Sequence, residues 1–359
     1  MTSAAGLVSA AHFHAKDSLL SGPAGGVLGA ANIAQSLGFQ KVITLDMGGT
    51  STDAARFDGH FDYDYLTKIA GVEMALPCLS IETVAAGGGS ICRFDGSKLC
   101  VGPESAGASP GPASYDSGGP LAITDVNLLL GKLDPSAMGI PVSREKASEA
   151  LQVVQNQIFE KTGNLLAEEE LLRGFEKIAN EKMAEAIRKI SISKGFDPKE
   201  YALLAFGGAG GLHACQIAEL LGIQTVILSY DGGLLSAFGI GQAQVERFGQ
   251  RQVLKNLTDC QAELPEIVAS LTAEGFEKLA AEGFSAGEMA VKRCLAYLRL
   301  KGQESSLEVH FQSVAQVADD FEEKYRRLFG HFPAGRAVEV ESVKVGVVAS
   351  ADTPNAAAG

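Results

Sequence analysis

The chain has 359 residues, of which 46% are hydrophobic and 20% charged, and its formal net charge at pH 7 is −13. This length exceeds what one ordinary hydrophobic core contains, so two domains are expected. The negative charge argues against nucleic acid as a partner, because phosphate binding needs a basic face. No apolar run reaches the roughly 18 residues of a membrane-spanning helix, and the first residues lack the pattern of a signal peptide.

Six cysteines are scattered along the chain without a Cys-x-x-Cys pair. In a chain of this size they indicate reduced thiols, so we expect a cytoplasmic protein. Cys92 and Cys100 are eight positions apart, but no further His or Cys lies at ligand spacing. A zinc site is therefore not expected.

The 42 glycines gather in short clusters between apolar segments, at residues 22–29, 48–49, 87–89, 102–119, 207–211 and 232–241. Loops held by a rigid scaffold commonly carry binding function. The clustering therefore predicts several loops that converge on one ligand.

The first predicted helix begins near Ser21 and ends near Leu37. Ser21 can cap it, and Pro23 suits its first turn. Gly25 and Gly29 leave one face without side chains, which permits close packing on another helix or beside a nucleotide. Both interpretations stay open at this point.

The segment Lys41–Asp58 reads KVITLDMGGTSTDAARFD. It predicts an apolar strand that ends at Asp46, a turn of small residues over Gly48–Thr52, and a second extended stretch that begins at Asp53. Adjacent glycines let a backbone approach a ligand and present N–H groups to an anion. Carboxylates beside such a site suggest a polyphosphate bridged by Mg²⁺. Taken alone, the segment is equally compatible with a glycine-rich hairpin turn.

Two further loops are candidates for binding. Glu82 precedes the run Gly87–Ser90, in which three glycines and a serine could hold an anion or a substrate. Val101–Pro112 is a long irregular segment whose one charged residue is Glu104. Long loops in compact domains are usually functional or disordered, and the small apolar residues here favour an ordered one.

Tyr201–Phe206 predicts a buried strand that runs directly into Gly207-Gly208-Ala209-Gly210-Gly211 and a helix. A strand, a glycine loop and a helix N-terminus together form a geometry that holds nucleotides. The spacing differs from the dinucleotide fingerprint, so that alternative is weaker. His213 could contact a ligand or pack between the helix and the loop, and the sequence does not separate these roles.

From about residue 246 the dense glycine clusters give way to an α+β pattern of strand, helix, two strands, helix and strand. We therefore expect a nucleotide-binding domain over residues 1–245, an α+β domain over residues 246–350 and a disordered tail over residues 351–359.

Six stretches occur in the order found in one known family: SGPAGGVLGA, LDMGGTSTD, ETVAAGGGSI, VGPESAGASPGP, FGGAGGLHA and GLLSAFG. Together they resemble the hydantoinase A/5-oxoprolinase family, which includes the ATPase subunits of acetone and acetophenone carboxylases. The resemblance covers residues 3 to about 350. It implies an α/β fold with a partial actin-like, sugar-kinase-like (ribonuclease H-like) ATPase domain and a C-terminal α+β domain.

The resemblance also implies roles for individual residues. Asp46 and Asp53 would lie near Mg²⁺ or the attacking group, with Thr50 as a further catalytic candidate. The residues expected to face the phosphates of ATP are Gly48, Gly49, Thr50 and Thr52. The residues expected to border the adenosine are Gly207, Gly208 and Gly210. Candidates for the substrate side are Glu82, Gly87–Ser90 and Glu104.

One departure from the family concerns the phosphate loops. Only one Asp-x-Gly-Gly-Thr segment is present, whereas the family carries another near its N-terminus. We therefore expect a truncated form, or one that relies on another chain. Ser109 stands where family members have an acidic residue, so no role that needs a carboxylate there is assigned.

The resemblance predicts a subunit of an ATP-dependent hydrolase of hydantoin or 5-oxoproline-type cyclic amides that phosphorylates the substrate carbonyl oxygen. Such chemistry needs positioning and charge neutralisation more than covalent catalysis. The alternatives are an ATPase subunit of a ketone carboxylase and a non-catalytic nucleotide-binding or scaffold remnant. Expected partners are a small cyclic amide or ketone, a hydantoinase B-like subunit and further copies of the chain in a homo-oligomer.

Overall fold

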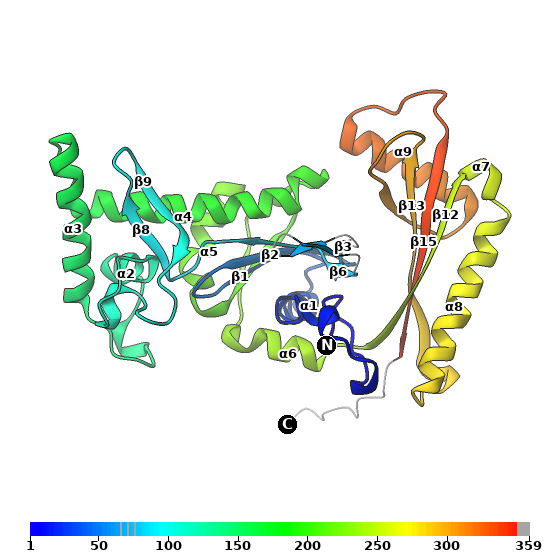
Figure 1. Cartoon of the computed structure of the whole chain (residues 1–359), viewed down its shortest axis with the longest axis horizontal. Coiled ribbons are helices and arrows are strands. Elements are labelled where there is room, and N and C mark those ends of the chain that lie inside the picture. The colour runs from blue at the N-terminus through cyan, green and yellow to red at the C-terminus, as the bar shows by residue number, and fades with distance from the viewer. Residues whose placement is uncertain (65–66, 70–71, 75–76, 350–359) are drawn as a thin grey trace. The chain divides into compact units, whose positions relative to one another are not determined.

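The computed structural model describes residues 1–64, 67–69, 72–74 and 77–349 (Figure 1). The chain divides into two compact units. The central unit comprises Leu20–Gln242, and the terminal unit comprises Met1–Leu19 together with the chain from Ala243 onward. The tail expected at residues 351–359 lies outside the described residues.

The first residues group with the terminal unit because they hydrogen-bond to the start of its first strand. Leu7 forms a parallel bridge with Val245. The Leu7 N–H donates to the Gln244 carbonyl at 2.7 Å, and the Leu7 carbonyl accepts from the Glu246 N–H at 3.3 Å. This division differs from the expected first domain of residues 1–245, because a bridge between distant segments leaves no local pattern in the sequence.

The central unit is built on a five-stranded sheet in the order β11-β10-β1-β2-β7. Its strands are β1 (Lys41–Met47), β2 (Thr52–Asp58), β7 (Ile81–Val84), β10 (Ala202–Phe206) and β11 (Val226–Leu228). β2 runs antiparallel to both β1 and β7, whereas β10 is parallel to β1 and to β11. Three antiparallel strands followed by two parallel ones, in this order, form the sheet of ribonuclease H-like domains. The predicted fold class is confirmed.

Three two-stranded ribbons accompany the main sheet of the central unit. They are β3 (Tyr63–Asp64) with β6 (Cys78–Leu79), β4 (Thr67–Ile69) with β5 (Val72–Met74), and β8 (Ser90–Phe94) with β9 (Leu99–Ser105). The helices of this unit are α1 (Ser21–Ser36), α2 (Ile123–Leu129), α3 (Arg144–Thr162), α4 (Glu168–Ile190), α5 (Gly207–Leu221) and α6 (Leu235–Gly241).

Different helices cover the two faces of the main sheet (Figure 1). Ile43, Leu45 and Met47 belong to the core that includes buried residues of α4 and α5. Val42, on the opposite face of β1, belongs to the smaller core beneath α1. Because side chains alternate along a strand, Asp46 lies on the α1 face at the end of β1.

α1 crosses α6 at backbone contact distance. A β-carbon on Gly29 would lie 2.5 Å from the Leu235 carbonyl oxygen, and one on Gly239 would lie 1.9 Å from the Gly25 carbonyl oxygen. Real side chains do not fit at such separations, so the glycines are required for the crossing. The glycine face of α1 therefore packs on another helix, which is one of the two roles that the sequence left open.

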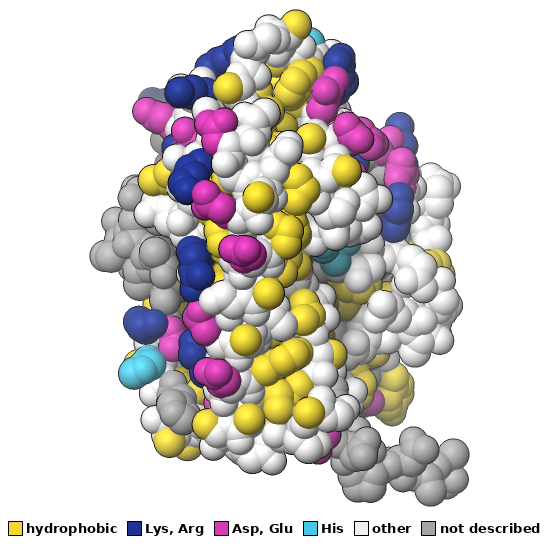
Figure 2. Space-filling model, turned by 90° about the vertical axis from the view of Figure 1, so that its right-hand side faces the viewer, with side chains coloured by type: hydrophobic (Ala, Val, Ile, Leu, Met, Phe, Trp, Pro, Cys, Tyr) yellow, Lys and Arg dark blue, Asp and Glu magenta, His cyan; other side chains and the backbone are white. Residues whose placement is uncertain are grey.

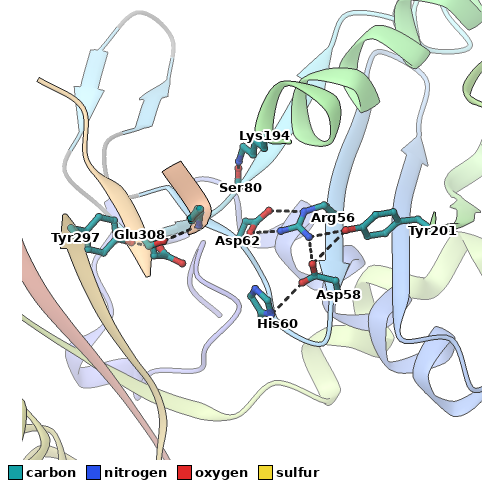
Figure 3. A network of polar contacts seen from close by, with 10 residues as sticks. Arg56, Asp58, His60, Asp62, Ser80, Lys194, Tyr201, Tyr297 and Glu308 are labelled. Atoms are coloured by element: carbon teal, nitrogen blue, oxygen red, sulfur yellow. Dashed lines mark hydrogen bonds and ion pairs between the residues drawn. The ribbon is translucent and has the colours of Figure 1, made fainter. Parts of the chain in front are cut away.

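A buried arginine joins β2 to the strand that follows α4 (Figure 3). The Arg56 side chain is 1% exposed and donates to both carboxylate oxygens of Asp62, at 2.6 and 3.0 Å. It also pairs with Asp58 and donates to the Tyr201 hydroxyl at 3.0 Å. Its guanidinium carbon lies 3.6 Å from the centroid of the Phe196 ring. All three guanidinium nitrogens thereby have hydrogen-bond partners inside the fold.

Replacement of Arg56 by Leu should therefore destabilise the central unit strongly. Two carboxylates would lose their cationic partner, and breaking a buried pair from one side costs about 3–5 kcal/mol. Urea unfolding of the intact chain measures this change. The control is Arg188→Leu, which removes ion pairs of 3.3 and 3.5 Å on the surface of α4 and should cost less than about 1 kcal/mol. Equal losses in the two variants would contradict the prediction.

The terminal unit has a four-stranded sheet in the order β12-β15-β13-β14. Its strands are β12 (Val245–Asn256), β13 (Met289–Leu300), β14 (Leu307–His310) and β15 (Val338–Ala349), and its helices are α7 (Leu257–Cys260), α8 (Glu263–Ala281) and α9 (Val314–Phe329). Buried residues of α8, α9 and one sheet face form a single hydrophobic core. Along the chain, the strands and the two long helices follow the order that the sequence predicted.

Basic side chains of β12 pair with acidic side chains of α8 and with Glu282, the residue that follows the last turn of this helix. The pairs are Arg247 with Glu282, Arg251 with Glu274 at 2.7 Å, and Lys255 with Glu263 at 2.8 Å. Figure 2 shows acidic and basic side chains close together on this side of the molecule, with hydrophobic side chains between them. Exposed pairs contribute little stability, so the apolar core holds the helix on the sheet.

Among the described residues, no helix is long and apolar enough to cross a bilayer.

Candidate functional site

Two aspartates face each other across the β1–β2 hairpin of the central unit. Asp46 pairs with Asp53 in the antiparallel register, and the turn Gly48–Ser51 lies between them. The Thr83 hydroxyl donates to Asp53 at 2.6 Å. Within the described part of the chain, no hydrogen-bond donor reaches the Asp46 carboxylate. Asp46 is therefore available for a cation or a ligand.

The second glycine loop supports the turn from behind. The N–H groups of Gly88 and Gly89 donate to the carbonyl oxygens of Gly48 and Gly49, at 3.0 and 2.6 Å. A β-carbon on Gly87 would lie 2.8 Å from the backbone of Gly49. Gly87–Gly89, which the sequence proposed as a second binding loop, thus forms the base of the first one.

These contacts occupy the carbonyl groups of the turn and leave its N–H groups available. Over the residues that the structure describes, the N–H groups of Gly49, Thr50 and Ser51 form no backbone hydrogen bond. Gly49 and Thr50 are also exposed. Consecutive free N–H groups in a tight turn form a concave anion site. The turn is therefore suited to bind phosphate oxygens through its backbone.

Thr52 is placed differently from the other residues of the loop. It is fully buried, and its hydroxyl donates to the Ala86 carbonyl at 2.5 Å. The sequence grouped Thr52 with the residues that face phosphate. In the structure its side chain instead ties β2 to the segment that leads into the second glycine loop.

The glycine helix α5 starts against Asp46. Gly207 has φ of +78°, and a β-carbon there would lie 2.4 Å from Asp46 Oδ1. Gly208 is exposed, with nothing within 4 Å of a β-carbon position. Gly210 is buried, and its β-carbon position lies 3.4 Å from the Leu45 carbonyl oxygen. Gly207 and Gly208 thus border the site, whereas Gly210 serves helix–strand packing.

Burial and mutual repulsion disfavour charge on the two aspartates. Burial, and then the nearby Asp53, raise the pKa of Asp46 to about 6. Burial also raises the pKa of Asp53, against the hydrogen bond from Thr83. A divalent cation between them would stabilise both carboxylates. No cluster of three or more His, Cys, Asp or Glu is arranged for a metal among the described residues. Mg²⁺ bound here would therefore need phosphate and water oxygens as its other ligands, which is its usual coordination.

The weaker sequence candidates lie outside this arrangement. Glu82 pairs with Lys189 at 2.7 Å, and the exposed Glu104 pairs with Arg93 at 3.4 Å. His213 is 1% exposed and packs inside the unit. Of the predicted residues, the structure brings together Asp46, Asp53, Gly48, Gly49, Thr50, Gly207 and Gly208.

The start of α2 contains two supporting residues whose contacts the sequence did not reveal. Thr124 donates to the Gly88 carbonyl through its N–H at 2.7 Å and its hydroxyl at 2.9 Å. The Asp125 carboxylate accepts from three backbone N–H groups, those of Ala113, Ser114 and Ala122. A Thr-Asp pair typically marks a helix start. Its contact with the distant glycine loop depends on the tertiary fold.

A family model described as hydantoinase/oxoprolinase matches residues 1–248. The chain belongs to the hydantoinase/oxoprolinase family. The resemblance expected from the six ordered motifs is thus confirmed.

Relatives within this family differ greatly in length. A 5-oxoprolinase of Pestalotiopsis fici is 39% identical over 365 residues, covering 98% of this chain and 28% of the relative. The caprolactamase subunit alpha of Pseudomonas jessenii is 32% identical over 358 residues, covering 95% of this chain and 50% of the relative. The chain therefore spans about half of the shorter relative and little more than a quarter of the longer one.

Two solved structures share the fold over almost the whole chain. The ATP-dependent caprolactamase of Pseudomonas jessenii matches with a TM-score of 0.88 and 28% identity, over 98% of this chain and 53% of that chain. Nucleotide-free acetone carboxylase matches with a TM-score of 0.69 and 24% identity, over 99% of this chain and 53% of that chain. The second match, at its lower identity, establishes only the common fold.

The contact between Gly207 and Asp46 can be tested with two neighbouring glycines. Gly207→Ala should lower the free energy of unfolding by about 1–3 kcal/mol, because it adds a clash and a strained positive φ. Gly208→Ala has space and should raise stability by about 0.5–1 kcal/mol, as Ala does within a helix. Urea unfolding compares the two variants, and the same sign of change in both would contradict the described contact.

The raised pKa of Asp46 predicts a pH-dependent effect on stability. The carboxyl group has a pKa of about 6 in the folded chain, above the ordinary value that it regains on unfolding. Its folded state is therefore favoured at low pH, and this advantage is lost as pH rises through about 6. Asp46→Asn should accordingly be more stable than the wild type at pH 8, by about 1–2 kcal/mol after allowance for screening.

At pH 4 the difference between Asp46→Asn and the wild type should be close to zero, because Asp46 is then protonated in the folded chain. Urea unfolding at both pH values measures it. Asp319→Asn, at an exposed position of α9, is the matched control and should leave both curves unchanged. A pH-independent effect of Asp46→Asn would refute the assigned pKa shift.

Proposed function

We propose that this chain forms the nucleotide-binding part of an ATP-dependent hydrolase of cyclic amides. The observation that carries the proposal is the meeting of three elements: the unpartnered Asp46, the turn Gly48–Ser51 with free N–H groups, and the first residues of α5. A carboxylate, an anion-binding turn and a helix N-terminus together suit a nucleotide with its metal.

In this proposal, each group acts on a separate part of ATP. The N–H groups of Gly49, Thr50 and Ser51 bind the β- and γ-phosphates, and the start of α5 at Gly207 and Gly208 borders the adenosine. Asp46 and Asp53 hold Mg²⁺, which supplies charge neutralisation at the phosphates. With a pKa of about 6, Asp46 is ionised at neutral pH and can serve as a ligand or orient the attacking oxygen.

We infer that the reaction begins with activation of an amide by phosphorylation. The ring carbonyl oxygen attacks the γ-phosphorus, and ADP leaves. The phosphorylated amide carbon is then a better electrophile, so that water adds to it and the ring C–N bond breaks, with the nitrogen leaving as a protonated amine. A second water hydrolyses the resulting acyl phosphate to the carboxylate and inorganic phosphate. The chain contributes position and charge rather than a nucleophile, since phosphoryl transfer depends mainly on electrostatic stabilisation.

Identity to relatives favours a cyclic amide over a ketone. The relatives at 39% and 32% identity are named as a 5-oxoprolinase and a caprolactamase subunit, and both names denote enzymes of cyclic amides. The ketone-activating acetone carboxylase matches at 24% identity. These comparisons support a lactam or hydantoin-type ring as the substrate class.

The proposal includes further polypeptide parts that add a second phosphate loop and carry out ring opening, whereas the three elements described above suffice to bind Mg-ATP. Two observations support it: the chain spans about half of the caprolactamase subunit, and that subunit is named alpha. We expect the additional part to supply the other phosphate loop and a hydantoinase B-like subunit to bind the substrate.

Calorimetric titration with Mg-ATP tests the nucleotide site directly. The wild-type chain should bind Mg-ATP, and Asp46→Ala should weaken binding at least about tenfold, which corresponds to about 1.4 kcal/mol. The affinity should rise as pH increases through about 6, since Asp46 must lose its proton to bind the cation. Removal of Mg²⁺ with EDTA should have the same effect as the substitution.

Asp319→Asn serves as the matched control and should bind like the wild type. Failure of the wild type to bind Mg-ATP at pH 8 would refute the proposal, as would unchanged binding by Asp46→Ala. Competition with AMP and tripolyphosphate shows whether the heat comes from the nucleotide site, because both fragments should displace ATP.

A further inference from the structure

A buried histidine connects three helices of the central unit. His213 of α5 is 1% exposed. Its Nδ1 lies 2.7 Å from Asn180 Oδ1 on α4, and its Nε2 lies 3.0 Å from Asn127 Nδ2 on α2. Neither ring nitrogen is left for a ligand. The ring therefore joins α5 to α2 and α4 by hydrogen bonds on opposite sides.

The direction of these hydrogen bonds is determined by charged groups at the other end of the network. Lys132 donates to Gln216 Oε1 at 3.1 Å, and Gln216 Nε2 donates to the Glu176 carboxylate at 3.2 Å. Asn180 Nδ2 donates to the same Gln216 oxygen at 2.7 Å. Because ammonium groups only donate and carboxylates only accept, the Asn180 oxygen must accept from a protonated His213 Nδ1.

The other ring nitrogen is therefore an acceptor. With the proton on Nδ1, the lone pair of Nε2 accepts the hydrogen bond from Asn127. Burial, and then the positive charge of Lys132, lower the pKa of His213 to about 4, against the attraction of Glu176. The ring is thus neutral, in one tautomer. Asn127 Oδ1 is buried without a hydrogen bond among the described residues, so the bond to His213 is the polar contact that this amide side chain makes.

Each of the two helices that meet at this bond also reaches a different side of the candidate site. At the start of α2, Thr124 holds the Gly88 carbonyl, and Gly88 in turn donates to Gly48 in the anion-binding turn. At the start of α5, Gly207 lies against Asp46. The His213–Asn127 hydrogen bond therefore connects α2, which supports the anion-binding turn through Gly88, with α5, which begins beside Asp46.

We propose that His213 is a positioning residue for the nucleotide: by joining α5 to α2 it sets the distance between the turn Gly48–Ser51 and the start of α5. This role rests on the proposed function, because it concerns the two loops to which that function assigns the two ends of ATP. His213 touches neither the nucleotide nor Mg²⁺. It acts through the helices that carry the loops.

A positioning role has a consequence that a stabilising role lacks. A ligand that contacts one loop is insensitive to the spacing of the loops, whereas ATP must contact both at once. Loss of the hydrogen bond should therefore weaken ATP binding while the affinities for adenosine and for tripolyphosphate stay unchanged. A general loss of folding would weaken all three ligands together.

The experiment compares His213→Leu with His213→Gln in the full chain. Leu removes both hydrogen bonds, whereas the Gln amide can donate to Asn180 and accept from Asn127. By calorimetry, Mg-ATP affinity should fall about tenfold or more in His213→Leu and by less than about threefold in His213→Gln, since tenfold corresponds to one hydrogen bond of about 1.4 kcal/mol. Both variants should bind adenosine and tripolyphosphate as the wild type does.

Asn127→Asp provides a second test that conserves side-chain size. Aspartate cannot donate to Nε2, so it should draw a proton onto the ring and raise the pKa of His213 from about 4. Ring-nitrogen NMR should show a neutral ring with the proton on Nδ1 in the wild type at pH 7 and a more basic ring in the variant. Asn127→Leu, which removes the donor to Nε2 and leaves His213 in place, should lose Mg-ATP affinity selectively, and this keeps the proposal testable if His213→Leu does not fold.

The outcomes separate the positioning role from the proposed function. If the wild type binds no Mg-ATP, both are overturned. If the wild type binds and both His213→Leu and Asn127→Leu bind equally well, the positioning role alone is overturned. Equal losses for ATP, adenosine and tripolyphosphate would also overturn it, because they indicate a purely structural histidine.

Discussion

The candidate site depends on backbone contact between two glycine segments. Gly88 and Gly89 hydrogen-bond to the carbonyl groups of Gly48 and Gly49, and the β-carbon that any other residue would place at Gly87 has no room. These bonds turn the carbonyl groups of the first loop inward and its N–H groups outward. The start of α2 supports this arrangement, because Thr124 donates to the Gly88 carbonyl.

The sequence indicated the positions of the loops more clearly than the contacts of their individual residues. Glycine clusters and acidic residues at strand ends are local patterns, and they correctly indicated the hairpin and the glycine helix. The exposure of a given side chain depends on what packs above it. Thr52 and Gly210 belong to the right motifs but are buried, the first by its bond to Ala86 and the second by β1.

The fold was predictable where apolar segments are distinct. The apolar run of β1 and the order of elements after residue 246 are examples. The grouping of residues 1–19 was not, because it depends on one bridge between Leu7 and Val245. The network around His213 was likewise hidden, since its members come from three helices and one loop. Spacing along the chain contains no information on such contacts.

The crossing of α1 and α6 has a consequence for how the chain is built. The central unit begins with α1 and ends with α6, and these helices touch at Gly25 and Gly239. The first and last helices of the central unit are thus adjacent, and the terminal unit is formed by the chain segments that precede and follow them. Architecture of this kind corresponds to a module inserted into a host domain. The central unit therefore interrupts the terminal unit at a single place, between residues 19 and 243, and the terminal unit pairs its own strands across that interruption at Leu7 and Val245.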